Sequence, residues 1–248
     1  MNLLPPLIVA HRGASAYAPE NTLPAFRLAW EQGADAIEGD FQLTRDGHIV
    51  CIHDVNTKRV ATQNLAVATS SLVELQALDV GAWKGEAFAG TRIPTLQEVM
   101  STVPEGKKFF IEIKSDAAIV PILAEIIRES ALSEDQIRII SFHPEVIQAV
   151  KHAMPDIPAF WISHIRSHPP GHLNPTPDQV LEILAETGAD GFSSGKVHIT
   201  PAFIRRIIDA GYEYHVWTVN HVRTARRFHR AGAASITTDR PGAIKRAF

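Results

Sequence analysis

The chain has 248 residues, of which 45% are hydrophobic and 21% are charged, an ordinary composition for a globular protein. Its formal net charge is −3 with the histidines counted as neutral, so no basic surplus predicts binding to nucleic acid or to an anionic membrane surface. Cys51 is the only cysteine, which excludes an internal disulfide and fits a reducing compartment.

The N-terminal segment lacks the features of a signal peptide. Residues 1–6 contain no lysine or arginine, and the apolar run Leu7–Ala10 is too short for a signal-peptide core. No apolar run reaches the ~18 residues that suggest a membrane-spanning helix. We therefore expect a cytoplasmic protein with no stable membrane association.

Short apolar runs alternate with amphipathic segments from one end of the chain to the other. Several of the runs are rich in β-branched or aromatic residues, as expected for strands that are buried on both faces. The runs expected to form strands are Leu7–Arg12, Ala36–Leu43, Lys108–Lys114, Ile137–Phe142, Pro158–Ser163, Asp190–Ser194, Glu213–Val219 and Ser235–Asp239.

Segments of helical length lie between these runs. Asn21–Gln32 follows the first expected strand and Ala118–Glu129 follows the third, and both place apolar side chains at helical spacing. Farther along, Thr200-Pro201 is a typical helix start. A Gly-Ala pair recurs between helix and strand at residues 33–34, 188–189 and 232–233, where glycine supplies the positive φ that ends a helix.

This alternation in a chain of this length predicts an α/β fold with a single domain, residues 1–248, built as a TIM (β/α)₈ barrel. An open doubly wound sheet would give the same local pattern and is the alternative. Ile49–His53 is expected to pair with the second strand through an Asp-Gly turn. Residues 55–93 then show no regular period, so we expect a small insertion after the second strand.

Charged residues interrupt two of the expected barrel strands. Glu38 and Asp40 are two residues apart and therefore share one face of their strand, and Glu112 and Lys114 repeat this arrangement on the next barrel strand. Carboxylates are costly to bury unless they are paired or bind a metal. Three carboxylates without a cysteine favour a hard divalent cation, Mg²⁺ or Ca²⁺, and a buried ion pair is the alternative.

Other polar residues are expected at the same end of the barrel, where TIM barrels carry their active sites. His11 and His53 each end an apolar run, and their ordinary pKa near neutrality suits an acid or a base, although a structural role is the alternative for any single histidine. Arg12 could contact a phosphate. Trp217 and Asn220 lie at the end of the seventh expected strand.

These residues fall in motifs that resemble those of the glycerophosphodiester phosphodiesterase family. Any one of the motifs is weak evidence, but the ordered set spans most of the chain. The matching motifs are His11-Arg12-Gly13, Pro19-Glu20-Asn21-Thr22, Glu38-Gly39-Asp40, His53-Asp54, Pro94-Thr95-Leu96, Glu112-Ile113-Lys114 and Thr238-Asp239-Arg240-Pro241.

The resemblance implies a TIM barrel with a small insertion after the second strand, and metal-dependent hydrolysis of a small glycerophosphodiester to sn-glycerol 3-phosphate and an alcohol. It implies metal ligation by Glu38, Asp40 and Glu112. It further implies general acid/base catalysis by His11 and His53. For the substrate and its phosphate, the expected residues are Arg12, Lys114, Glu20 and Trp217. The sequence does not indicate an oligomeric state.

Three alternatives stay open at this level. A related barrel phosphodiesterase could act on lysophospholipids or phosphoinositides, and it would need an apolar groove to which Trp83, Phe88 and Trp161 could contribute. A catalytically silent barrel could bind metal or phosphate alone. Finally, the spacing of His164, His168 and His172 suits a metal site on a helix, but Pro169 and Pro170 disfavour a continuous helix. A loop over the active-site face, His164–Pro177, is the better interpretation.

Overall fold

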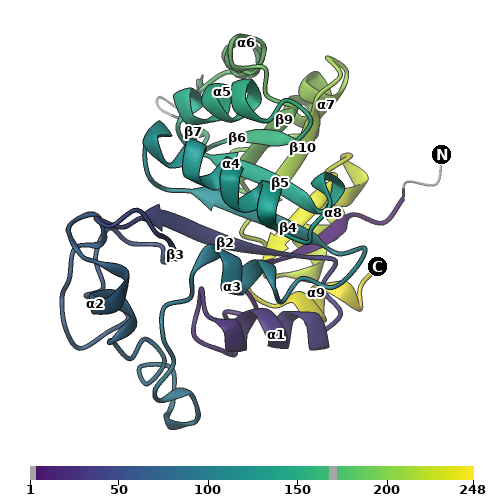
Figure 1. The fold of residues 1–248 in the computed structure, drawn as a ribbon. Coiled ribbons are helices and arrows are strands. Elements are labelled where there is room, and N and C mark those ends of the chain that lie inside the picture. The colour runs from purple at the N-terminus through teal and green to yellow at the C-terminus, as the bar shows by residue number, and fades with distance from the viewer. Residues whose placement is uncertain (1–3, 168–171) are drawn as a thin grey trace.

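The computed structural model describes residues 4–167 and 172–248 and contains a closed barrel of eight parallel strands (Figure 1). Their order around the barrel is β1, β11, β10, β9, β6, β5, β4 and β2, and β2 pairs again with β1. This closure confirms the TIM barrel and excludes the open sheet. The strands are β1 Leu7–His11, β2 Ala36–Leu43, β4 Lys108–Ile113, β5 Ile137–Ser141, β6 Ala159–Ser163, β9 Gly191–Gly195, β10 Glu213–Trp217 and β11 Ser235–Thr238.

A helix follows each barrel strand and packs on the outside of the barrel (Figure 1). The helices begin where the sequence offers a cap: the Thr200 side chain accepts a hydrogen bond from the Phe203 N–H, and Pro201 occupies the first turn. These helices are α1 Leu23–Glu31, α3 Leu96–Met100, α4 Val120–Glu129, α5 Pro144–Ala153, α6 Pro177–Thr187, α7 Pro201–Ile208, α8 Val222–Arg230 and α9 Pro241–Lys245.

Strand alternation divides the apolar residues between two cores. On β4, Phe109 and Ile111 belong to the large cluster between the strands and the helices. Phe110 belongs to a smaller cluster with Phe160 and Ile162, and it lines the same pocket as Glu112. The barrel interior is therefore apolar toward the N-terminal ends of the strands and carries carboxylates toward their C-terminal ends. Side chains that alternate between the two faces of a strand predict this arrangement.

Two of the three Gly-Ala pairs are followed by an aspartate that joins neighbouring strands. Asp35 accepts a hydrogen bond from the Ile8 N–H at 3.0 Å, and Asp190 accepts one from the Ala159 N–H at 2.8 Å. Gly188 ends its helix with a φ of +70°, which favours glycine. The repeat thus fixes the N-terminal end of the barrel, opposite the carboxylates.

The segment between β2 and α3 projects beside the barrel (Figure 1). It begins with β3 Ile49–Cys51, antiparallel to β2, and continues with η1 Val67–Thr69, α2 Leu72–Gln76 and η2 Glu86–Phe88. It has an apolar cluster of its own, which includes Val50, Val67, Leu75, Val80 and Ile93. The expected small insertion is therefore present, and it starts at the C-terminal end of β2. Two further 3₁₀ turns lie elsewhere, η3 Ala117–Ile119 and η4 Glu134–Gln136.

The histidine-rich segment after β6 forms a short antiparallel hairpin where it is described. β7 Arg166–Ser167 pairs with β8 Leu173–Asn174. The helix-face metal site that the sequence disfavoured would need His168, which lies outside the described residues. His164 precedes the hairpin, so no helix of the described residues connects His164 with His172.

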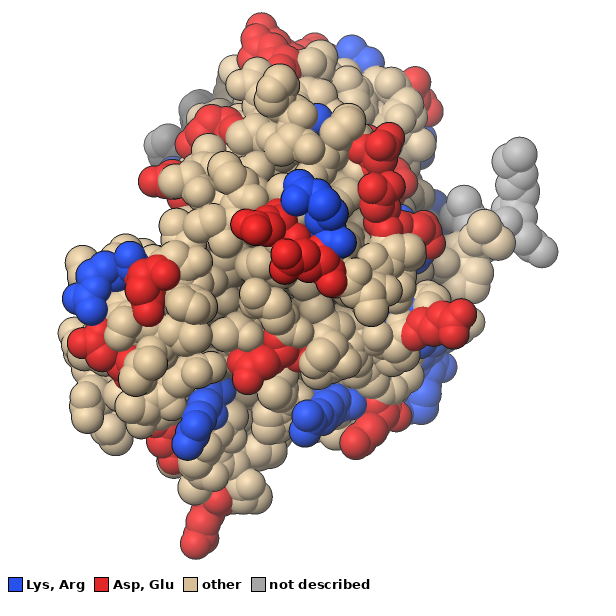
Figure 2. Space-filling model, viewed as in Figure 1, with Lys and Arg blue, Asp and Glu red and all other residues tan. Residues whose placement is uncertain are grey.

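The surface in Figure 2 shows acidic and basic side chains intermixed on the visible face, without an extended area of one sign. Within residues 4–167 and 172–248, no helix is long and apolar enough to cross a membrane.

Candidate active site

Three buried carboxylates lie together at the C-terminal ends of β2 and β4. The strand register places Asp40 beside Glu112, while Glu38 lies one pleat below on the same face. One carboxylate oxygen from each of the three lies within 4.8 Å of the others. The structure thus brings together the three residues that the sequence suggested as metal ligands.

Two oxygens of this cluster have no hydrogen-bond partner. Glu38 Oε2 accepts the Arg12 N–H at 2.9 Å, and Asp40 Oδ2 accepts the Asn21 Nδ2 at 2.8 Å. Glu38 Oε1 and Asp40 Oδ1 are buried without a hydrogen-bond partner, and Asp40 Oδ1 has only a longer ion-pair contact, to Lys114 Nζ at 3.7 Å. Because an unpartnered buried carboxylate oxygen is costly, the cluster suits a cation that would bind these atoms.

The carboxylates crowd one another electrostatically. Burial and the charge of Asp40 raise the pKa of Glu38 to about 8, and the same causes raise the pKa of Glu112. Burial acts on Asp40 as well, but the charges of Arg12 and Lys114 outweigh it and hold its pKa below the usual range. The crowding therefore favours the protonated forms of Glu38 and Glu112, and a bound divalent cation would favour their ionised forms.

Arg12 and Lys114 lie against the carboxylates. Arg12 Nε is 3.1 Å from Asp40 Oδ2, and Lys114 Nζ is 2.8 Å from Glu112 Oε1. Arg12 has a φ of +56° and is followed by Gly13, where a Cβ would lie 2.6 Å from the Ala25 backbone. The backbone therefore makes a left-handed turn in which only glycine fits at position 13. This turn directs the Arg12 N–H at Glu38.

Each of the two predicted imidazoles is held by a carboxylate at Nδ1. His11 Nδ1 lies 2.7 Å from Asp239 Oδ1, and His53 Nδ1 lies 2.7 Å from Asp54 Oδ1. A carboxylate at this nitrogen favours the tautomer with a proton on Nδ1 and leaves Nε2 available for proton transfer. Asp54 follows His53 directly in the sequence, whereas Asp239 lies 228 residues from His11.

Asp239 is a site residue to which the sequence analysis assigned no role. Its carboxylate accepts hydrogen bonds from the Asn220 amide at 2.5 Å and the Ser15 hydroxyl at 3.2 Å, besides contacting His11. Burial raises the pKa of Asp239, but these bonds outweigh it and lower the value to about 2. The signals in the sequence were its position at the end of the last strand and its place in the motif Thr238-Asp239-Arg240-Pro241.

The two histidines differ in the direction of their pKa. Burial lowers both values; for His11, the bond to Asp239 and the charge of Glu38 outweigh burial and leave the pKa raised. For His53 burial prevails, and the pKa is lowered. Because a cation bound at Glu38 would offset its pull on His11, these directions do not decide which imidazole is the base.

A chain of ion pairs connects Asp54, the partner of His53, to Arg12, the neighbour of His11. Arg59, from the insertion, donates from Nε to Asp54 at 2.7 Å and from its two terminal nitrogens to Glu20 at 2.8 and 2.9 Å. Glu20 also accepts from Arg12 at 2.8 Å. Glu20, whose role the sequence left open, is thus a bridge between two arginines. Arg59 was missed because its segment has no regular pattern.

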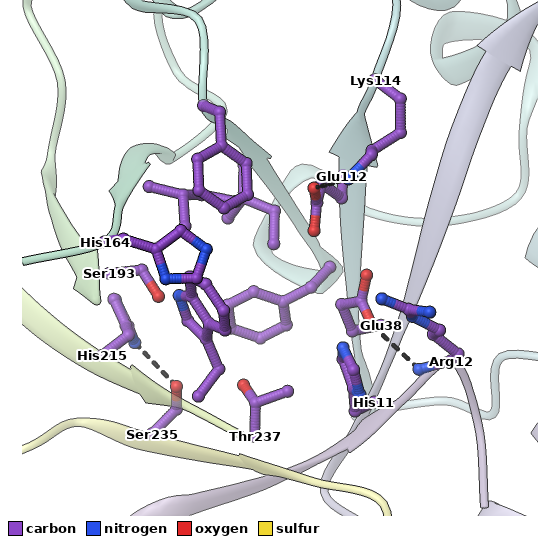
Figure 3. Close-up of a pocket in the computed structure, with 15 residues that line it drawn as sticks. His11, Arg12, Glu38, Glu112, Lys114, His164, Ser193, His215, Ser235 and Thr237 are labelled. Atoms are coloured by element: carbon purple, nitrogen blue, oxygen red, sulfur yellow. Dashed lines mark hydrogen bonds and ion pairs between the residues drawn. The ribbon is translucent and has the colours of Figure 1, made fainter. Parts of the chain in front are cut away.

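The pocket beside these residues has two unlike walls (Figure 3). His11, Arg12, Glu38, Glu112 and Lys114 form the charged wall. His164, Ser193 and Thr237 lie on the opposite wall. Phe142, Ile162 and Trp217 also line the pocket, and the Lys114 ammonium lies over the Phe142 ring, 5.5 Å from its centroid.

Trp217 contacts two other rings that line this pocket. Its ring makes edge contacts with His164 and Phe142, with centroids 4.7 and 5.6 Å away. Its Nε1 is buried without a hydrogen-bond partner.

The aromatic residues considered for an acyl groove, Trp83, Phe88 and Trp161, do not line this pocket. Trp161 packs against Phe192 in the outer core.

Comparison with known proteins agrees with this geometry. Residues 11–243 match the Glycerophosphoryl diester phosphodiesterase family. The chain belongs to this family. A glycerophosphodiester phosphodiesterase of Caldanaerobacter subterraneus is 34% identical over 241 residues, covering 95% of this chain and 94% of its own.

Solved structures of the glycerophosphodiester phosphodiesterase family share the fold. A phosphodiesterase of Oleispira antarctica, in complex with the product sn-glycerol-3-phosphate, superposes with a TM-score of 0.87 at 27% identity and covers 98% of this chain and 96% of its own. A glycerophosphodiester phosphodiesterase of Agrobacterium tumefaciens gives 0.80 at 26% identity, with 96% and 98% covered. The chain is therefore an enzyme of this class, a phosphoric diester hydrolase on a TIM barrel.

Proposed function

We propose that this enzyme hydrolyses glycerophosphodiesters to sn-glycerol 3-phosphate and an alcohol, with two histidines and a divalent cation. The observation that carries the proposal is the cluster of buried carboxylates with two unpartnered oxygens, in a site with two carboxylate-held imidazoles. The Oleispira antarctica relative with bound sn-glycerol-3-phosphate supports the identity of the product.

Glu38, Asp40 and Glu112 would hold the cation. An all-oxygen donor set favours Mg²⁺ or Ca²⁺ over softer metals. When bound, such a cation supplies Lewis-acid polarisation of a phosphate oxygen.

Arg12 and Lys114 would bind the remaining phosphate oxygens. Burial lowers the pKa of Lys114, but the charges of Glu112 and Asp40 outweigh it and raise the value, so the ammonium stays protonated at neutral pH. Arg12 keeps its charge at any ordinary pH and can donate from more than one nitrogen. Both cations stabilise the charge of the phosphoryl group in the transition state.

His11 would remove the proton from the nucleophile, which is either the neighbouring glycerol hydroxyl or a water. His53 would protonate the leaving alcohol. Asp239 and Asp54 keep each ring oriented through Nδ1. The reverse assignment uses the same contacts, and in either order each transfer is worth ~10²–10⁴-fold in rate.

The glycerol end of the substrate fits the part of the pocket around Trp217. Trp217, Ser193 and Thr237 line this pocket, and the unpartnered Trp217 indole N–H and the two hydroxyls would offer partners to glycerol hydroxyls. The rings of Phe142 and Trp217 would cover the carbon chain. We further propose a cytoplasmic location and a small-molecule substrate, without binding to nucleic acid or stable membrane association.

The test is turnover on a panel of glycerophosphodiesters with Mg²⁺, Ca²⁺ or a chelator. We expect release of sn-glycerol 3-phosphate with at least one of the two cations and none with the chelator. Full activity in excess chelator would overturn the role of the cation. Bound metal without turnover would favour the catalytically silent barrel, and cleavage of a lysophospholipid in preference to glycerophosphocholine would favour the related lipid-cleaving enzymes.

A further inference from the structure

A second cavity adjoins the catalytic pocket on the other side of His11 and Arg12. Those two residues are the ones that line both cavities within the described part of the chain. The loops after β1, β10 and β11 and the insertion form the second cavity, with Ser15, Glu20, Trp83, Lys84, Asn220, Asp239 and Arg240 among its lining residues. A substrate whose phosphate lies at Arg12 can therefore extend into two separate spaces.

The carboxylates of the second cavity are already engaged. Asp239 accepts from Ser15 and Asn220 and contacts His11. Glu20 is paired with two arginines, Arg12 and Arg59. Neither carboxylate is therefore free to balance a cationic ligand.

Two cations of the same cavity lack such partners. Lys84 and Arg240 line the cavity, and neither forms an ion pair with a carboxylate of the described residues. Lys84 Nζ donates to the Ser15 carbonyl oxygen at 2.6 Å, which fixes the ammonium at the cavity and leaves two of its three N–H groups for a ligand. The cavity thus presents a net positive charge.

Trp83 does not convert this cavity into a site for a quaternary ammonium. Its side chain is 46% exposed, but Lys84 Nζ already lies over the ring, 5.4 Å from the centroid. A ligand cation on the same ring would meet the Lys84 charge at short range, which opposes the cation–π attraction.

We infer that the second cavity binds the alcohol half of the substrate and selects an alcohol that carries a further negative charge, such as a second phosphate. The inference rests on the proposed function, because the aromatic pocket then takes the glycerol half. Since His11 lines this cavity and His53 does not, the inference uses the reverse assignment of the two histidines, in which His11 protonates the leaving alcohol. An anionic alcohol would meet Lys84 and Arg240, whereas a choline group would meet two like charges.

The experiment compares the initial rates of sn-glycerol 3-phosphate release from three substrates by the full chain with its cation. These are bis(glycerophospho)glycerol, whose leaving alcohol carries a phosphate, glycerophosphoglycerol, which has a neutral alcohol, and glycerophosphocholine. We expect kcat/KM at low ionic strength to be at least about fivefold higher for the first than for the third, after correction for its two equivalent ester bonds. Salt should reduce the difference, because it screens exposed charges.

Lys84→Met should lower this preference about three- to tenfold, and Lys84→Arg should retain it. Lys58→Met removes an exposed insertion lysine outside the cavity and should leave the preference unchanged, as a control for net charge. A choline ester cleaved as well as the anionic one, or a Lys84→Met preference equal to that of the wild type, would overturn the inference. No release from any of the three substrates would instead refute the proposed function itself.

Discussion

Arg59 offers the sharpest test of how the insertion contributes to catalysis. It joins Asp54, the partner of His53, to Glu20, the partner of Arg12, through three hydrogen bonds of 2.7 to 2.9 Å. Arg59→Met removes all three and keeps an unbranched apolar stem in place of the guanidinium-bearing chain. Asp54 then loses the contact that fixes it behind His53, so the imidazole should lose orientation rather than chemical function.

The structure limits how much Arg59→Met can change the free energy of unfolding and the turnover. The Arg59 side chain is 43% exposed, so water screens its ion pairs and each is worth only about 0.2–1 kcal/mol. We therefore expect the free energy of unfolding to fall by about 1–2 kcal/mol. Turnover of glycerophosphocholine should fall about tenfold, a part of the ~10²–10⁴-fold that a positioned acid contributes.

The assay separates positioning from general damage by the choice of leaving group. If His53 protonates the leaving alcohol, the loss should be large for the choline ester and small for the p-nitrophenyl ester of glycerol 3-phosphate, whose leaving group needs little protonation. In a His53→Ala background, Arg59→Met should add almost nothing. Arg45→Met is the matched control, because Arg45 pairs with Glu74 on the exposed surface at 3.3 Å. Equal losses on both esters would refute the reasoning.

Four further outcomes follow from the site and the barrel. His11→Ala or His53→Ala should each lower turnover at least about a hundredfold with an unchanged circular dichroism spectrum, and a loss of only a few-fold would argue against their roles. Glu38→Ala should weaken both cation binding, measured by calorimetry, and activity; unaltered binding would remove it from the cation site. Gly191→Ala should lower the free energy of unfolding by about 1–3 kcal/mol, because its Cβ would lie 2.3 Å from a backbone oxygen of β10; an unchanged melting temperature would contradict this packing. The pKa of Asp239, lowered to about 2, means that its hydrogen bonds stabilise the fold above its unfolded value of about 4 and that this contribution is lost as the pH falls from 4 to 2. Asp239→Asn should therefore destabilise the protein at pH 6 more than at pH 2.5 in urea titrations, and an equal effect at both pH values would be evidence against the shift.

The barrel could be predicted because its strands are buried on both faces. Lys108–Lys114 was expected as a strand and is one up to Ile113. The apolar run of this segment shows that the strand is buried, and Glu112 and Lys114 mark the end of the strand at which the site lies. Local patterns of this kind also predicted the carboxylate cluster, since a period of two and the parallel register suffice to align Asp40 with Glu112.

The contacts that orient the catalytic groups could not be predicted in the same way. Asp239 reaches His11 only because the last strand closes on the first, and no local pattern encodes that pairing. Arg59 lies in a segment whose fold depends on its own small apolar cluster rather than on a repeating pattern. His164 was grouped with other histidines by spacing, whereas its ring packs against Phe142 and Trp217 in the pocket.

The bond between His11 and Asp239 has a consequence for protein synthesis. Since β1 needs β11 beside it, the ribosome must release the chain as far as residue 239 before His11 acquires its partner. A nascent or prematurely terminated chain that ends before residue 239 would have the cation ligands but no oriented imidazole at residue 11, and would therefore be catalytically inert. Orientation of His11 therefore requires that the chain be synthesised through β11 and that this strand close on β1.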